Sequence, residues 1–289
     1  MEIWGIINPI LRVLLYAASF GSVGTFLFVV HFRLYQTEAL ILYCRRLIIR
    51  SALLGIFVSL MLFLSVAGNL GGDLESSVDL IMLKLAFETK AGFAALIALL
   101  GFSMMALVAQ KDGALRLLIC FISGGLILVS FLLAGHTLKG GVFTQIVLFL
   151  HLVGISFWVG SFFPFRWMSI HDKASNLQAI ALKFGTLGIG YVGLLFLAGC
   201  ILAYNLVGGF VQLMLTSYGQ VLLVKIALVS FLLSLGALNK LRLVPLMEKD
   251  PLLGVKRFKA SVHFEIIITF FILLLSSFLT TSLIVPMDM

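Results

Sequence analysis

Eight long apolar stretches, separated by short segments that hold most of the charged residues, dominate this sequence. Each stretch is about 20 residues long, which is the length an α-helix needs to cross the hydrocarbon core of a bilayer. Lipid offers the backbone no hydrogen-bond partners, so such segments must be helical. The sequence therefore predicts an all-α, polytopic membrane helix bundle of about eight transmembrane helices. We place these helices at residues 11–33, 49–69, 91–110, 117–136, 143–164, 184–206, 219–239 and 262–284.

The composition excludes an ordinary soluble domain. Hydrophobic residues make up 62% of the chain and charged residues 11%, whereas about a quarter of the residues in a soluble domain are charged. The net charge of +8 at pH 7 does not indicate a nucleic-acid partner, because the basic residues lie in short loops between apolar stretches. The first stretch is too long for the apolar region of a signal peptide, and we expect it to be retained as a helix.

Basic residues are concentrated in every second loop. Fifteen lie in the loops after the first, third, fifth and seventh stretches, whereas the opposite loops hold Lys84, Lys90 and Lys139. The remaining two, Arg12 and Lys225, lie within or at the end of apolar stretches. Loops on the cytoplasmic side of membrane proteins are enriched in Lys and Arg. With an even number of helices, this bias predicts that both termini lie outside.

A weak internal repeat divides the chain into two halves of four helices, 1–140 and 141–289, within a single membrane domain. The first stretch contains LLYAASFGSVGTFLF and the fifth contains FLHLVGISFWVGSFF, which aligns Gly24 with Gly160. The start of the third stretch resembles the start of the seventh, and Gly92 falls near Gly219. An offset of four helices preserves orientation, so the two copies would form a parallel repeat, an arrangement found in transporters.

Two histidines are the leading candidates for a metal site. His136 lies at the outer end of the fourth stretch, and His151 lies about two turns into the fifth. The short connection between these stretches lets the two side chains approach each other in the outer third of the bilayer. Paired imidazoles suit copper, zinc or the iron of a haem, although each histidine alone could instead hydrogen-bond to a neighbouring helix. We predict His136 and His151 as metal ligands.

Lys225 lies about two turns into the seventh stretch from the same side. Ionisable groups at membrane depth are costly and are usually functional, but a lysine can also extend its stem to the interface. If Lys225 faces the histidines, its charge disfavours a cation there. We therefore predict it as either a pathway residue or a structural one.

Three further polar or aromatic residues are candidates deeper in the membrane. Trp158 lies seven residues after His151, on roughly the same helix face, and its indole N–H needs a partner. Glu265 lies in the first turn of the eighth predicted helix, where a carboxylate is electrostatically favourable, and Asn239 ends the seventh. These residues form either a polar station at the inner end of a pathway or ordinary packing and capping groups.

A weaker candidate lies at the end of the chain. Met287 and Met289 flank Asp288 on the tail predicted to lie outside. Thioethers favour Cu(I), so the tail is a candidate outer capture site.

Motifs of soluble catalysis are missing from the sequence. It contains no phosphate-binding loop, GxSxG, HExxH or CxxCH motif, and no loop is long enough to form a nucleotide-driven domain. Cys44, Cys120 and Cys200 form no CxxC pair, and their odd number argues against a disulfide framework. We therefore expect structural cysteines and a protein that is not an enzyme.

The second half resembles the copper resistance protein D (CopD) family of bacterial inner membranes. The matching segments are GHT at 135–137, LHLVGISFWVG at 150–160, and TSYGQVLLVKIALVSFLLSLGALNKLRLVP at 216–245. The resemblance covers about half the chain, and the order and spacing of these segments are more specific than each motif alone. It implies a copper-handling protein of the bacterial inner (plasma) membrane that works with a small periplasmic copper-binding protein, CopC. It also implies that His136 and His151 are copper-associated, with Trp158, Lys225, Asn239 and Glu265 as matching positions.

Copper transport across the inner membrane, in the direction of uptake, is the leading hypothesis. Copper would be accepted near His136 and His151 and passed inward between the helices, in a lipid bilayer and with no nucleic-acid partner. A b-type haem electron carrier is an alternative, because membrane histidines on different helices also ligate haem. A membrane copper sensor or assembly factor that does not transport is another.

Overall fold

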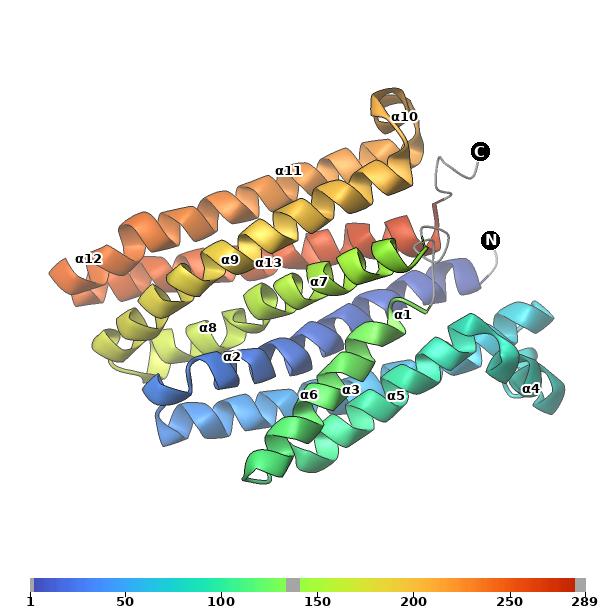
Figure 1. Ribbon diagram of the computed structural model, residues 1–289, viewed down its shortest axis with the longest axis horizontal. Coiled ribbons are helices and arrows are strands. Elements are labelled where there is room, and N and C mark those ends of the chain that lie inside the picture. The colour runs from blue at the N-terminus through green and yellow to red at the C-terminus, as the bar shows by residue number, and fades with distance from the viewer. Residues whose placement is uncertain (1–2, 134–140, 284–289) are drawn as a thin grey trace.

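The computed structural model describes residues 3–133 and 141–283, and every regular element in these ranges is helical. Two π-helical segments, Phe20–Gly24 and Asn239–Leu243, connect α1 to α2 and α11 to α12. The predicted all-α bundle is therefore confirmed (Figure 1). The helices are α1 (Trp4–Ser19), α2 (Thr25–His31), α3 (Glu38–Gly71), α4 (Leu80–Glu88), α5 (Lys90–Val108), α6 (Ala114–Ser130), α7 (Gly141–Gly160), α8 (Phe162–His171), α9 (Ala174–Val207), α10 (Phe210–Leu215), α11 (Ser217–Leu238), α12 (Val244–Lys249) and α13 (Pro251–Thr281).

Seven helical segments in the described ranges are long and apolar enough to cross a membrane, which confirms the polytopic character of the chain. Three of them are composite, because α1 continues into α2, α7 into α8, and α11 into α12. The predicted fourth helix corresponds to α6, which has 17 residues and is shorter than the other seven. The prediction placed the end of this helix at residue 136, outside the described residues.

The predicted starts of three helices were wrong by ten residues or more. α3, α9 and α13 begin at Glu38, Ala174 and Pro251, whereas their apolar stretches begin at residues 49, 184 and 262. Polar caps define two of these starts: the Thr37 side chain accepts a hydrogen bond from the amide of Leu40, and Asp250 accepts one from Leu253. An apolar stretch marks only the part of a helix in contact with lipid, and the amphipathic turns beyond it are also helical.

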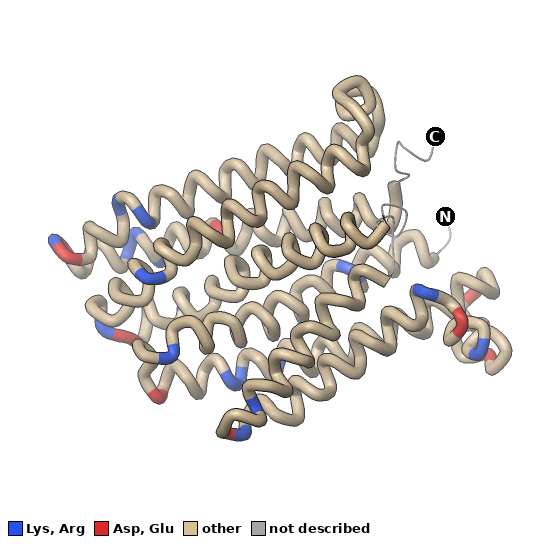
Figure 2. Tube along the Cα trace, in the orientation of Figure 1, with Lys and Arg blue, Asp and Glu red and all other residues tan. Residues whose placement is uncertain are grey.

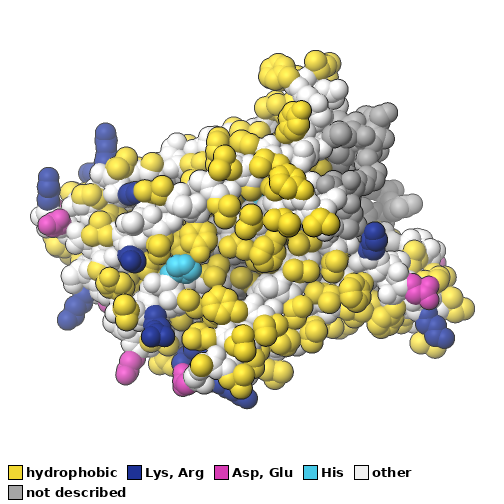
Figure 3. Space-filling view, viewed as in Figure 1, with side chains coloured by type: hydrophobic (Ala, Val, Ile, Leu, Met, Phe, Trp, Pro, Cys, Tyr) yellow, Lys and Arg dark blue, Asp and Glu magenta, His cyan; other side chains and the backbone are white. Residues whose placement is uncertain are grey.

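Most of the charged residues lie at the two ends of the bundle. α1 begins and α13 ends at one end, which also carries α4 and α10 (Figure 1). Lys and Arg gather at the opposite end, around α12 and the turn from α2 to α3 (Figure 2). Hydrophobic side chains cover the middle of the face shown in Figure 3. This arrangement suits a bundle inserted in lipid, and the placement of both termini outside stays a prediction from the loop charges.

The two predicted halves meet where α1 and α2 pack against α7 and α13. At the centre of this contact, Gly24 and Gly160 are so close that a Cβ on Gly160 would lie 2.2 Å from the Cα of Gly24. These are the two glycines that the internal repeat aligns. Small residues at helix crossings allow backbones to approach closely in membranes, so the absence of side chains here lets the two halves pack together.

Local structure recurs where the repeat aligns the third and seventh predicted helices. The short helices α4 and α10 each end at a threonine that caps the next helix. The Thr89 hydroxyl accepts a hydrogen bond from the amide of Gly92 over 2.9 Å, and Thr216 accepts one from Gly219 over 3.1 Å. These recurrences support the predicted four-plus-four organisation, which stays a prediction.

Candidate metal site and membrane cavity

Five of the eight residues singled out from the sequence lie in the described part of the chain. His136, Met287 and Met289 lie outside the described residues, so their predicted roles stay predictions. The other five lie on α7, on α11 and the π-helical segment after it, and on α13. They are His151, Trp158, Lys225, Asn239 and Glu265.

His151 lies on α7 where this helix packs against α9. Its Nδ1 atom is 3.2 Å from the backbone oxygen of Leu195, and its ring lies beside Gly199, where a Cβ would be 3.4 Å from Cε1. A carbonyl oxygen can only accept, so this hydrogen bond requires a proton on Nδ1. In the neutral ring Nε2 is then the unprotonated nitrogen, and an unprotonated ring nitrogen is what binds a metal ion.

A cavity of about 400 Å³ lies beside His151, bordered by α1, α7, α9, α11 and α13. Most of its lining is apolar, which agrees with a site inside the membrane. Phe196 on α9 and Ile226 on α11 line it and are also exposed, so the cavity reaches the lipid-facing surface between these helices. The polar and charged lining residues include Arg12, Tyr16, His151, Tyr218, Lys225, Ser230, Thr269, Ser276 and Thr280.

Two basic side chains, Arg12 and Lys225, line this cavity, and no described lining residue is acidic. Arg12 is held over the rings of Tyr16 and Phe131, 5.7 Å and 5.2 Å from their centroids. Lys225 lies near enough to His151 for their charges to interact, and it forms no ion pair in the described ranges. The structure thus places Lys225 on the cavity side of α11, where its charge opposes a free cation at His151.

Removing the charge of Lys225 is expected to tighten copper binding. A unit charge several ångströms away in a partly buried site contributes on the order of 1–2 kcal/mol, so Lys225→Met should raise the apparent copper affinity roughly tenfold. Competition titration of the purified protein against a calibrated copper chelator measures this change. Lys183→Met removes an exposed basic residue of α9 and serves as the control. Equal affinities for wild type and Lys225→Met would show that Lys225 does not face the bound metal.

Glu265, Asn239 and Trp158 come together beyond the inner end of the cavity. The Asn239 amide nitrogen donates to Oε1 of Glu265, and the Ser261 hydroxyl lies 3.4 Å from the same oxygen. The indole N–H of Trp158 lies near this carboxyl group but outside hydrogen-bond geometry. Trp158 reaches this position because Gly236 on α11 has no side chain, and a Cβ there would be 2.6 Å from the ring. The cluster joins three helices that are far apart in the sequence.

The interpretation of Glu265 as a helix-start carboxylate is wrong. α13 begins at Pro251, so Glu265 lies one residue from the middle of a 31-residue helix. Its side chain is 3% exposed. The error arose because the polar first turns of α13 carry many basic residues and were assigned to a loop. A carboxyl group in this position lies well beyond the first turn of α13, where the helix dipole has little effect.

Hydroxyl side chains on α13 are the main feature that the sequence analysis missed. Thr269, Ser276 and Thr280 line the cavity at intervals of seven and four residues, and Glu265 precedes Thr269 by four. Residues with these spacings lie on one face of a helix. The periodicity was available in the sequence, and it predicts a polar stripe that runs from the end of α13 to its middle.

Arg12, Tyr16 and Tyr218 were also missed as cavity residues, because they lie near the ends of apolar stretches and have the appearance of interfacial anchors. Cys200, which we expected to be structural, lines the cavity as well. Within the described ranges, no three or more His, Cys, Asp and Glu side chains gather into a group able to hold a metal ion. His151 is the histidine that lines the described part of the cavity, and its role as a metal ligand stays a prediction.

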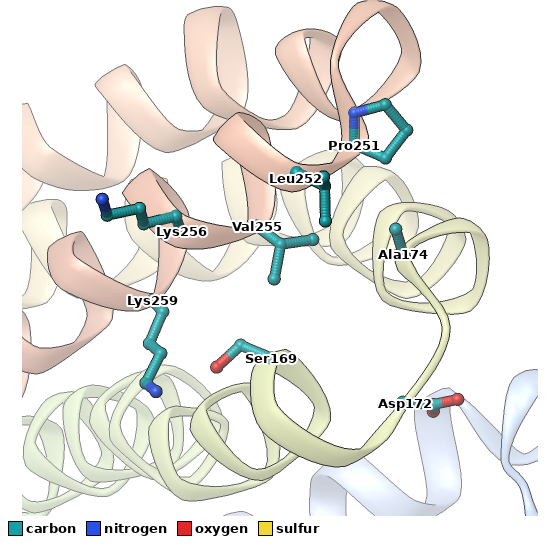
Figure 4. Close-up of a pocket in the computed structure, with 8 residues that line it drawn as sticks. All are labelled: Ser169, Asp172, Ala174, Pro251, Leu252, Val255, Lys256 and Lys259. Carbon is teal, nitrogen blue, oxygen red and sulfur yellow. The ribbon is translucent and has the colours of Figure 1, made fainter.

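A second cavity, of about 380 Å³, lies at the basic end between α8, the start of α9 and α13 (Figure 4). Lys256 and Lys259 line it together with Ser169 and Asp172. The Asp172 oxygens already accept hydrogen bonds from the amide of Lys173 and the side chain of Asn176. The groups left free are ammonium groups, so this cavity does not suit a copper ion.

Two family models match the chain, one in each predicted half. The model of the copper resistance protein D-like N-terminal domain matches residues 1–145, and the copper resistance protein D model matches residues 178–279. Copper transport protein CutJ of Bacillus subtilis (strain 168) is 28% identical in an alignment of 265 positions that covers 85% of this chain and 48% of CutJ. The chain thus spans about half the length of this curated relative. No solved structure matches the chain.

These matches agree with the geometry of the described residues. The N-terminal model covers half of the chain, and the second model covers the helices α9, α11 and α13 that border the cavity. The described fold is that of a polytopic membrane protein, and the matches support a copper-related function in a membrane. The chain belongs to the copper resistance protein D family.

Proposed function

We propose that this chain carries copper ions across the bacterial inner membrane in the direction of uptake, and so contributes to copper homeostasis and resistance. Copper enters at the end where α1 begins and α13 ends, which the loop charges assign to the outside. It is accepted near His151 and His136 and leaves at the basic end. The similarity to CutJ, a copper transport protein, supports this assignment.

One observation carries the proposal: polar side chains line a single path through an otherwise apolar bundle. His151 and the α13 hydroxyl groups border the cavity, and Trp158 lies at its inner end. Glu265 and Asn239 follow beyond Trp158. Ionisable groups in membrane helices mark ion pathways, because their burial in lipid is otherwise too costly.

The donor set suits copper better than a hard metal ion. Imidazole nitrogen and thiolate sulfur are preferred copper ligands, and the cavity offers His151 and Cys200. His136 is the proposed second imidazole. Because Lys225 and Arg12 oppose a free cation, copper is delivered already bound to a donor, and a periplasmic CopC-like protein is the proposed partner.

The haem alternative needs two histidines on different helices at matched depth. In the described ranges, the other histidine at a helix contact is His31. Its Nδ1 pairs with the backbone oxygen of Leu27 over 2.8 Å, and its Nε2 lies 3.1 Å from the hydroxyl of Tyr191. Both of its nitrogens are therefore engaged, which favours copper over haem.

Copper entry into sealed vesicles tests the proposal. We expect vesicles that contain the purified chain to accumulate copper at least several-fold faster than protein-free vesicles, after external copper is removed with an impermeant chelator. Copper that binds without entering the lumen would contradict transport and favour a sensor or assembly factor. A Soret band in the absorption spectrum of the purified protein would favour the haem alternative.

A further inference from the structure

The polar cluster around Glu265 has unused hydrogen-bonding capacity in the middle of the bundle. Glu265, Asn239, Thr269 and Trp158 are each at most 9% exposed. The Oδ1 atom of Asn239, the hydroxyl of Thr269 and the indole nitrogen of Trp158 are buried without a hydrogen-bond partner. Buried polar groups in proteins are almost always paired. The indole N–H points towards the carboxyl group of Glu265, but the oxygens of Asn239 and Thr269 remain unpaired, which indicates a bound species.

The charge of the Glu265 carboxyl group indicates that the bound species is a cation. An ionised carboxylate in a low-dielectric interior costs several kcal/mol unless a cation balances it. Within the described ranges, no basic side chain forms an ion pair with Glu265, which receives only the neutral donors Asn239 and Ser261. Titratable groups of the helices packed around it lie on both sides. Those on the cavity side are Arg12, Tyr16, His151, Tyr218 and Lys225, and those towards the basic end include Arg166, His171, Lys183, Lys240, Arg242, Glu248, Lys249, Lys259 and His263.

The chemistry of the cluster separates it from the copper site. Its free acceptors are oxygens: the carboxylate of Glu265, the amide oxygen of Asn239 and the hydroxyl of Thr269, one helical turn from Glu265. Oxygen ligands suit small hard cations, whereas copper prefers nitrogen and sulfur. Asn239 also begins a π-helical segment. Such segments are frequent at functional sites, and transporters hold coupling ions near the bilayer midplane where helices are interrupted.

We propose that Glu265, Asn239 and Thr269 form a second cation site, which binds a small hard cation, Na⁺ or H⁺, in the interior of the helix bundle. Thr269 and Trp158 both line the cavity that contains His151, so this site adjoins that cavity. Cation binding at Glu265 does not depend on copper being the cargo. The use of the bound cation as a coupling ion for copper movement rests on the function proposed above.

Sodium binding to the purified full chain in detergent is the first test. The protein is placed in choline chloride, NaCl is added at constant ionic strength, and the thermal unfolding midpoint and ²²Na⁺ binding are measured. We expect Na⁺ to raise the midpoint of the wild type. Glu265→Gln and the near-isosteric Thr269→Val should each weaken the apparent sodium affinity more than tenfold.

Matched variants distinguish sodium binding at this site from general effects of substitution and from copper binding. Glu88→Gln and Thr186→Val alter an exposed glutamate on α4 and an exposed threonine on α9, and they should keep the wild-type sodium response. His151→Ala should also keep it. Failure of copper transport with an intact sodium response would thus overturn the proposed function and leave this site standing.

Infrared difference spectroscopy identifies the proton as the bound cation. If sodium has no effect, a protonated carboxyl band that changes with pH and vanishes in Glu265→Gln, but persists in Glu88→Gln, supports a proton site. Thr269→Val should shift this band, because it removes a hydroxyl group from its surroundings. The absence of both a sodium response and a Glu265-dependent carboxyl band would overturn the proposal.

Discussion

Replacing Gly160 by alanine is expected to lower the free energy of unfolding by about 3 kcal/mol, the upper end of the usual cost of overpacking. A Cβ at this position would lie 2.2 Å from the Cα of Gly24 and 2.7 Å from its oxygen. Both are backbone atoms, so no flexible side chain can move aside, and α7 must separate from the π-helical segment that contains Gly24. Denaturant unfolding of the detergent-solubilised protein measures this loss of stability. The yield of monodisperse protein should also fall.

Gly125→Ala is the matched control. Gly125 lies in the interior of α6, and a Cβ there meets no atom within 4 Å. Alanine is a better helix former than glycine, so this variant should be as stable as the wild type or more stable by about 0.5–1 kcal/mol. Equal losses in Gly125→Ala and Gly160→Ala would contradict the close packing of the two halves at Gly24.

Replacing His151 by alanine is expected to reduce copper accumulation in vesicles to the level of protein-free controls. The variant removes the imidazole from the described lining of the cavity, and copper loses a nitrogen ligand that the apolar walls cannot replace. Copper quantification of the purified protein should show a parallel loss of bound metal. The site residues stay predictions until this comparison is made.

His171→Ala controls for the loss of a histidine. His171 lies at the end of α8, where its ring stacks on Trp167 at 5.0 Å outside the cavity. This variant should accumulate copper like the wild type. His151→Asn keeps a side-chain donor for the oxygen of Leu195 but is a poor copper ligand, so it separates helix packing from metal binding. Wild-type accumulation by His151→Asn would place the metal ligand elsewhere.

The helical fold could be predicted because a bilayer permits few alternatives. Each apolar stretch of spanning length must form a helix, and the described ranges have helices at all eight predicted places. The helix ends could not be predicted in the same way. α13 begins eleven residues before its apolar stretch, because the solvent constrains only the residues that contact the hydrocarbon core.

The candidate site was predicted in part. His151, Trp158, Lys225, Asn239 and Glu265 all had polar or aromatic side chains at membrane depth, which is a signal readable from one sequence. The residues that α1 and α9 contribute to the cavity could not be predicted from the sequence. Arg12 on α1 borders the cavity from the first half, and Cys200 on α9 borders it from the second half. These positions could not be predicted because no local sequence pattern specifies which helices pack side by side.

By itself the sequence determined the class of fold, the basic end of the bundle and the set of residues that are costly in lipid. These follow from solvent and charge, which act on each segment separately. Only the tertiary structure decided that Gly24 meets Gly160, that Glu265 lies at the middle of α13, and that Asn239 reaches it. The physical reason is that lipid fixes which segments are helical but leaves their pairing to close packing and interhelical hydrogen bonds.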